Sequence, residues 1–183
     1  ALTQLMEAFV SPHANPMTDA LCREGIKRAA AALERAFLDG SDMAARKDMC
    51  LASLWGGMAL ANAKLGAVHG IAGPFGGMFP SPHGAVCGRL LPEVMAMNIS
   101  VLEERSLDSN ALTRYEEIAE MARPGQKVSA QDGAVWVRKL CKRLGVPPLS
   151  TYGMSENDVD DLIRQSQKSS SMKGNPIQLT RAD

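Results

Sequence analysis

Two of the three histidines, His69 and His83, lie in a glycine-rich stretch and have the side-chain type best suited to bind a metal ion. They are 14 residues apart, too far to share one helix face as an i, i+4 pair would. The run GPFGGMFPSP between them is rich in turn formers and can end one helix and start another. Such a turn would bring both imidazoles to the same end of a helical bundle. His83 follows Pro82 and should lie in the first turn of its helix, where the helix dipole disfavours imidazolium and leaves a neutral ring available.

The alternative is that both histidines only pack against neighbours, because a histidine among small apolar residues is commonly a hydrogen-bonded packing residue. Glycines such as Gly56, Gly57 and Gly66 would then mark close helix crossings. The two interpretations require different surroundings. Metal binding requires the imidazoles to converge on a point that faces an open cleft, whereas packing requires each ring to be buried with its own hydrogen-bond partner.

Other motifs in the sequence give weaker indications of a functional site. LGAVHGIAGPFGG contains neither G-x-G-x-x-G nor G-x-x-x-x-G-K-[ST], and no strand precedes it, so a nucleotide-binding loop of the usual kind is excluded. His13 lies in a polar turn and is expected to be solvated. The residues 169–171 form a polar serine loop without a His and Asp arrangement that could make a nucleophile.

Helices must position these residues. Apolar side chains recur with a helical period in seven segments, and no alternating strand pattern exceeds four residues. The segments cover about 2–10, 16–38, 42–62, 86–97, 112–122, 134–144 and 155–163, with a polar gap around 103–110. Asn15 followed by Pro16 is a good helix start, because it combines an N-cap residue with proline at the first helical position. The sequence predicts an all-α, bundle-like domain of about seven helices.

Length and composition fit one domain, with 183 residues of which 45% are apolar. The net charge is zero, which argues against nucleic acid as a partner, and no run approaches 18 apolar residues, which argues against a membrane span. The N-terminus lacks the features of a signal peptide and the four cysteines lie far apart, so we expect reduced thiols in a cytoplasmic protein. The chain has no initiator Met and starts in apolar periodicity, which suggests part of a longer protein.

The same residues carry a family resemblance. The signature region of the iron-containing (group III) alcohol dehydrogenases resembles the run LANAKLGAVHGIAGPFGGMFPSPHGAVCGRLLPEVMAMN. In that family the region contains G-x-x-H-G-x-A, then P-H-G fourteen residues further on, and then a helix with a Leu-Leu-Pro core. ALTQLMEAFVSPHANPMTDAL resembles the second signature, which reads D-A-L-T-H, and SSSMKGNPIQLT resembles the C-terminal N-P-x-x-L-T segment. The similarity extends over essentially the whole chain.

The resemblance implies an enzyme of two domains, of which residues 1–183 are the C-terminal all-helical metal and substrate domain, with a dehydroquinate synthase-like fold. The N-terminal α/β domain that binds NAD or NADP is absent from this chain. His69 and His83 match two metal ligands of the family. The ligand Asp would fall immediately before Ala1, the histidine of D-A-L-T-H is Gln4 here, and a further histidine that handles protons is Gly73 here. With two firm ligands and Gln4 as a weak third, we expect weak or no metal binding by this chain.

The resemblance therefore implies the helical half of an iron-type, NAD(P)-dependent alcohol dehydrogenase. Iron or zinc would act as a Lewis acid on the oxygen of a small alcohol or aldehyde while hydride passes between substrate and nicotinamide. We expect the isolated chain to be inactive and to form a homodimer, with an exposed apolar patch around Phe75, Met78 and Phe79 where the cofactor domain is missing. The alternatives are a maleylacetate-reductase-like enzyme with a carboxylate-binding pocket, and a non-catalytic helical module that mediates assembly.

Overall fold

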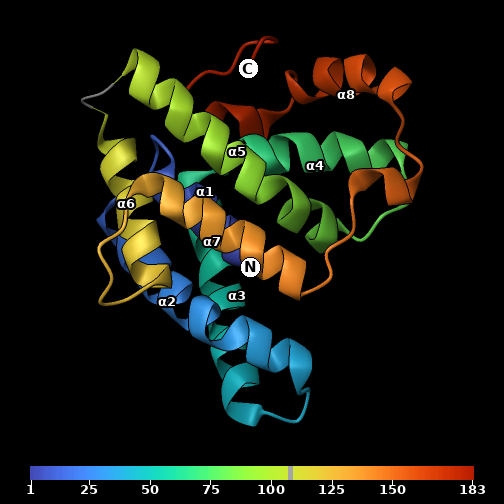
Figure 1. Cartoon of the computed structure of the whole chain (residues 1–183). Coiled ribbons are helices and arrows are strands. Elements are labelled where there is room, and N and C mark those ends of the chain that lie inside the picture. The colour runs from blue at the N-terminus through green and yellow to red at the C-terminus, as the bar shows by residue number, and fades with distance from the viewer. Residues whose placement is uncertain (107–108) are drawn as a thin grey trace.

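The structure, a computed structural model, describes residues 1–106 and 109–183, so residues 107 and 108 of the predicted polar gap lie outside the described residues. Eight α-helices and three short 3-10 helices, and no strand, form the described part of the chain (Figure 1). The α-helices are α1 (Leu2–Val10), α2 (Pro16–Leu38), α3 (Met43–Ala63), α4 (Ala67–Met78), α5 (His83–Arg105), α6 (Asn110–Ala122), α7 (Ala130–Arg143) and α8 (Val159–Ser166). The 3-10 helices cover Leu149–Tyr152, Glu156–Asp158 and Ser170–Gly174. The all-α prediction is confirmed, with one helix more than expected.

The additional helix is α4, which runs through the glycine-rich stretch. The prediction that GPFGGMFPSP is a turn was therefore wrong for most of its length, since only residues 79–82 separate α4 from α5. Glycine and an internal proline disfavour a helix. Here Val68, Ala72 and Phe75 form one apolar face that is buried in the core. Packing of that face outweighs the low intrinsic propensity, as is common for helices in proteins.

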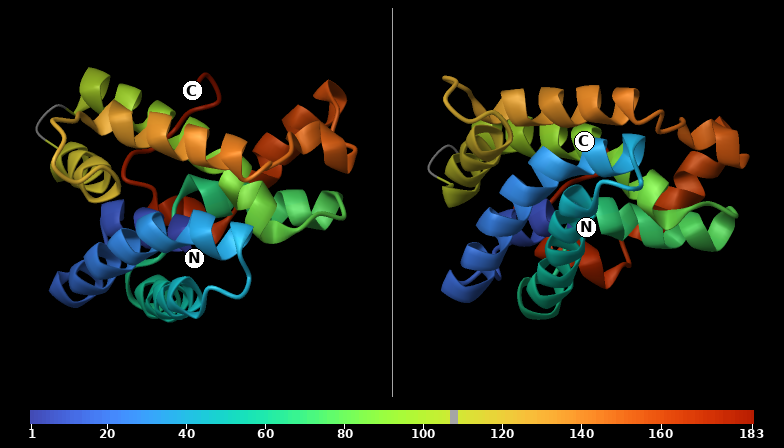
Figure 2. Two further views of the ribbon diagram at one scale, coloured as in Figure 1. Left: turned by 60° about the horizontal axis from the view of Figure 1, so that its bottom comes forward. Right: turned by 90° about the horizontal axis from the view of Figure 1, so that it is seen from below.

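Helix α1 is the centre of the molecule and is buried along almost its whole length. It packs against α2, α3, α5 and α6. The helices α2 and α3 form an antiparallel hairpin, and α7 lies along α5 in both views of Figure 2. The N-cap prediction for α2 is confirmed, because the Asn15 side chain accepts hydrogen bonds from the backbone N–H groups of Met17 and Thr18.

One helix, α5, is long and apolar enough by composition to cross a membrane. More than half of its most apolar window is buried inside the protein, which is typical of a core helix. The expected apolar patch is wrong in its central residue, because Phe75 is fully buried. Large exposed apolar side chains lie instead at the end of the α2–α3 hairpin, where Phe37, Leu38 and Met43 are more than half exposed.

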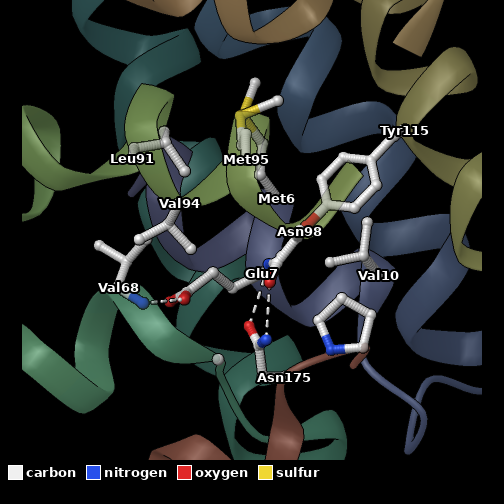
Figure 3. Close-up of a pocket in the computed structure, with 12 residues that line it drawn as sticks. Met6, Glu7, Val10, Val68, Leu91, Val94, Met95, Asn98, Tyr115 and Asn175 are labelled. Carbon is white, nitrogen blue, oxygen red and sulfur yellow. Dashed lines mark hydrogen bonds between the residues drawn. The ribbon is translucent and has the colours of Figure 1, made fainter. Parts of the chain in front are cut away.

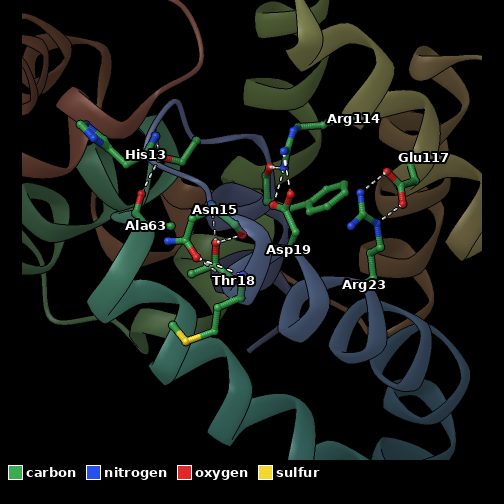
Figure 4. A network of polar contacts seen from close by, with 11 residues as sticks. His13, Asn15, Thr18, Asp19, Arg23, Ala63, Arg114 and Glu117 are labelled. Carbon is green, nitrogen blue, oxygen red and sulfur yellow. Dashed lines mark hydrogen bonds and ion pairs between the residues drawn. The ribbon is translucent and has the colours of Figure 1, made fainter.

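A nearly buried ion pair joins α6 to the start of α2 (Figure 4). The Arg114 guanidinium donates to both carboxylate oxygens of Asp19, at 2.6 and 2.8 Å, and to the carbonyl oxygen of Phe9 at 2.7 Å. It also lies over the Phe9 ring, 4.9 Å from the centroid. The side chain of Arg114, on α6, therefore contacts both α1 and α2.

We predict that Arg114→Ala lowers the free energy of unfolding by about 3 kcal/mol, because it leaves the Asp19 carboxylate without its partner in a site with little water. The matched control is Arg138→Ala, which removes the exposed pair with Glu93 and should cost at most about 1 kcal/mol. Urea denaturation of both variants measures the difference. Equal losses would show that Arg114 contributes no more than a surface charge.

Candidate metal centre

The structure brings His69 and His83 together although they belong to different helices. His69 is in the first turn of α4, and His83 is the first residue of α5, as expected. Their ring centroids are 5.4 Å apart and the rings are tilted by 56°. His83 is exposed and His69 is only partly buried, so the two rings face a common region with access to solvent.

A buried carboxylate fixes the orientation of His69. Oε2 of Glu7, on α1, lies 2.5 Å from Nδ1 of His69. The same carboxylate accepts the backbone N–H of Val68 at 2.7 Å through Oε1 and that of His69 at 3.4 Å through Oε2. Glu7 thus satisfies unpaired N–H groups at the positive end of α4. Because Nδ1 donates to Glu7, Nε2 of His69 is left to bind a metal ion.

A buried amide network completes the cap of α4 (Figure 3). Oδ1 of Asn175 accepts the backbone N–H of Ala67 at 3.1 Å. Asn175 and Asn98 of α5 exchange two side-chain hydrogen bonds of 3.0 and 2.8 Å, and Asn98 also donates to the Tyr115 hydroxyl. These residues and Glu7 line a cavity of about 10 Å³, with room for about one water molecule.

The electrostatic surroundings of the two imidazoles differ. Burial disfavours the charged form of His69, but hydrogen bonds with Cys87 and Glu7 outweigh this effect and raise its pKa to about 9. Burial lowers the pKa of His83, and the charges of His69 and of the N-terminal amino group lower it further. His83 therefore provides a neutral ring, whereas a metal ion must displace a proton from His69.

Sequence reasoning missed two residues at this place. Cys87 lies one turn after His83 on α5, and its Sγ is 3.4 Å from Nε2 of His83. Potential ligand atoms of His69, His83 and Cys87 all lie within 4.8 Å of one another. The i, i+4 spacing of His83 and Cys87 was a visible signal. Glu7 gave a weaker one, as the one charged residue of the segment 2–10.

The other two positions singled out in the sequence are Gln4 and Gly73. The Oε1 atom of Gln4 faces Gly56 of α3, at 3.4 Å from the place that a Cβ atom would take there. Gly73 borders open space, with nothing within 4 Å of a Cβ built on it. The start of α1 lies near the cluster, because the Ala1 amino group interacts electrostatically with both His83 and Cys87.

Comparisons with known proteins agree with this architecture. The profile of the Fe-containing alcohol dehydrogenase family, C-terminal part, matches residues 1–183. The chain is 33% identical to 1,3-propanediol dehydrogenase of Klebsiella pneumoniae over 96% of its length and 45% of the relative. It is 34% identical to alcohol dehydrogenase 4 of Saccharomyces cerevisiae over 99% of its length and 46% of the relative.

A solved structure shows the same fold. The crystal structure of sulfoacetaldehyde reductase from Bifidobacterium kashiwanohense in complex with NAD+ matches with a TM-score of 0.82 at 26% identity, covering 98% of this chain and 44% of that one. The chain thus spans somewhat less than half the length of the curated relatives it matches.

We predict that Glu7→Gln lowers the free energy of unfolding by about 1–3 kcal/mol. The amide of glutamine has one N–H₂ group, which cannot accept a hydrogen bond, and one oxygen, which is a weaker acceptor than a carboxylate. The N–H groups of α4 and Nδ1 of His69 would therefore lose part of their hydrogen bonding. Urea denaturation gives the stability, and ¹⁵N chemical shifts of the His69 ring report the change at Nδ1. Glu116→Gln makes the same chemical change on the exposed face of α6 and should stay within about 0.5 kcal/mol. Unchanged His69 shifts in Glu7→Gln would contradict the proposed orienting contact.

Proposed function

This chain belongs to the Fe-containing alcohol dehydrogenase family, and on that premise we propose that it is the metal and substrate half of an NAD(P)-dependent oxidoreductase. The enzyme interconverts a small alcohol and its aldehyde or ketone. His69 and His83 hold a divalent ion, iron or zinc, and Gln4 is a weaker candidate ligand. The relatives named for acting on small alcohols support this reaction class.

The observation that carries the proposal is the convergence of His69 and His83 at an accessible place. A merely structural role predicts two buried rings, each with its own partner. His83 is exposed, and its ring nitrogen lies beside Cys87 and His69 rather than against a carboxylate or backbone group. This arrangement favours the metal-binding interpretation over the packing interpretation.

The donor set fits a divalent transition metal. Imidazole nitrogen suits iron and zinc alike. When bound, the ion supplies Lewis-acid polarisation of the substrate oxygen, while the nicotinamide carries the hydride. The chain's own contribution is positional: Glu7 holds the proton of His69 on Nδ1, so that Nε2 faces the site, and α5 presents His83 from its first turn.

The open space at Gly73 bears on how substrate and protons are handled. Gly73 leaves open space on α4, four residues after His69, so no side chain from that position contacts the substrate. We propose that water exchanges protons with the substrate oxygen there. Since Gly occupies this position, the open space there accepts a substituent that a larger side chain would exclude.

The nucleotide is proposed to bind to a domain outside these 183 residues. The chain matches 45–46% of its relatives, and a structural relative is a complex with NAD+. We therefore expect the isolated chain to be inactive. We place the enzyme in the cytoplasm, which the four free thiols support, and we expect a homodimer, for which the exposed apolar residues Phe37, Leu38 and Met43 offer a contact surface.

We expect the purified chain to bind Zn²⁺ weakly, and we predict that His83→Ala weakens this binding by at least about 100-fold further, since loss of a ligand should exceed the effect of losing an outer partner. Competition with a fluorescent chelator measures the affinity. His13→Ala is the control, because His13 is the third histidine and lies exposed in the loop before α2. Binding with equal affinity by wild type and His83→Ala would place the ion elsewhere and refute the assignment.

A further inference from the structure

We propose that Cys87 is a third protein ligand of the metal, which makes the centre a His₂Cys site that favours zinc. The inference rests on the proposed metal centre and assigns the ligand that the two histidines alone lack. A metal site with an open coordination position normally has three protein ligands. Among the described residues, the thiol of Cys87 is the strong donor grouped with the two imidazoles.

The position of Cys87 on its helix meets this requirement. His83 and Cys87 are at i and i+4 of α5, so their side chains lie on the same face one turn apart. Nε2 of His83 and Sγ of Cys87 are 3.4 Å apart. A tetrahedral zinc ion with bonds of about 2.05 Å to nitrogen and 2.3 Å to sulfur needs about 3.6 Å between those atoms. The two residues are therefore spaced for joint binding without a change of the helix.

His69, on the neighbouring helix α4, is the third residue of the cluster. Its Nδ1 is engaged by Glu7, and ligand atoms of the three residues lie within 4.8 Å of one another. Nε2 of His69 is the ring nitrogen that remains for the ion. Cys87 is 4% exposed and His83 is exposed, so the cluster is closed towards the core and open towards solvent. An ion held by these three residues would keep access to solvent on the side of His83, where a substrate oxygen or water would enter.

The other three cysteines have different surroundings. Sγ of Cys141 lies 3.1 Å from the carbonyl oxygen of Gly88, to which it donates, and burial raises the pKa of Cys22 to about 12. Cys50 is exposed on α3. Cys87 alone among the four has imidazole nitrogens beside its sulfur.

Binding would require only a proton transfer. The Cys87 S–H bond breaks, the proton leaves to solvent, and the sulfur electron pair forms the bond to the ion, with no change of oxidation state. A thiolate is a soft donor, and zinc exceeds iron(II) in affinity for a given nitrogen and sulfur site. A site with a thiolate therefore favours zinc more strongly than one built of imidazole and amide oxygen.

Titration of the purified chain with Co²⁺ tests the proposal without reference to activity. Cobalt replaces zinc as a spectroscopic probe, and a thiolate ligand gives an intense near-ultraviolet charge-transfer band. The variants are Cys87→Ala, the nearly isosteric Cys87→Ser, and Cys22→Ala as a control that removes another buried thiol. Circular dichroism and thermal unfolding without metal verify that each variant is folded.

We expect the wild type and Cys22→Ala to show the charge-transfer band. Cys87→Ala and Cys87→Ser should lose it and bind Zn²⁺ about 10- to 100-fold more weakly. If wild type binds Co²⁺ in a His83-dependent manner without the band, or if the band persists in Cys87→Ser, Cys87 is not a ligand, although the histidine centre stands. If wild type binds neither ion, the proposed centre and the role of Cys87 are both wrong.

Discussion

The interaction on which the rest of the structure depends is the contact of the Glu7 carboxylate with the N-terminus of α4. A buried carboxylate is costly unless its lone pairs have partners. Here the partners are two backbone N–H groups and the His69 ring, at the positive end of a helix. The requirement to satisfy Glu7 fixes α1 against α4 and at the same time sets the tautomer of His69. One charge therefore links the packing of the core to the chemistry of the site.

The same helix end is where distant parts of the chain meet. Asn175, from the C-terminal segment, caps Ala67 and pairs with Asn98 of α5. Gly174 permits the approach, since a Cβ there would lie 1.9 Å from the carbonyl oxygen of Leu65. Buried amides of this kind are stable only as a complete set, because each unpaired group would lose a hydrogen bond without gaining one from water. The site is consequently held by residues from α1, α4, α5 and the C-terminal segment.

Much of the fold follows from local sequence signals. The apolar periodicity and the Asn15 cap identify helices, and Pro82 identifies the start of α5, because each signal acts within a few residues. The prediction failed at α4, where glycine and Pro74 gave a turn signal. The helix forms there because Val68 and Phe75 pack into a core assembled from α1, α5 and the C-terminal segment, which no local window contains. The patch around Phe75 was misjudged for the same reason.

The residues of the candidate site also differ in whether local sequence or contacts between distant elements identify them. His69 and His83 could be found because of their residue type and the motifs around them, and Cys87 because of its i, i+4 spacing from His83. Glu7 acquires its role only through contacts between helices. This division also explains the asymmetry of the centre. His69 is fixed by a buried partner, while His83 is held by its own helix and faces solvent. One imidazole is therefore held in place by a buried carboxylate while the other stays accessible, which combines the rigidity and the access that a binding site needs.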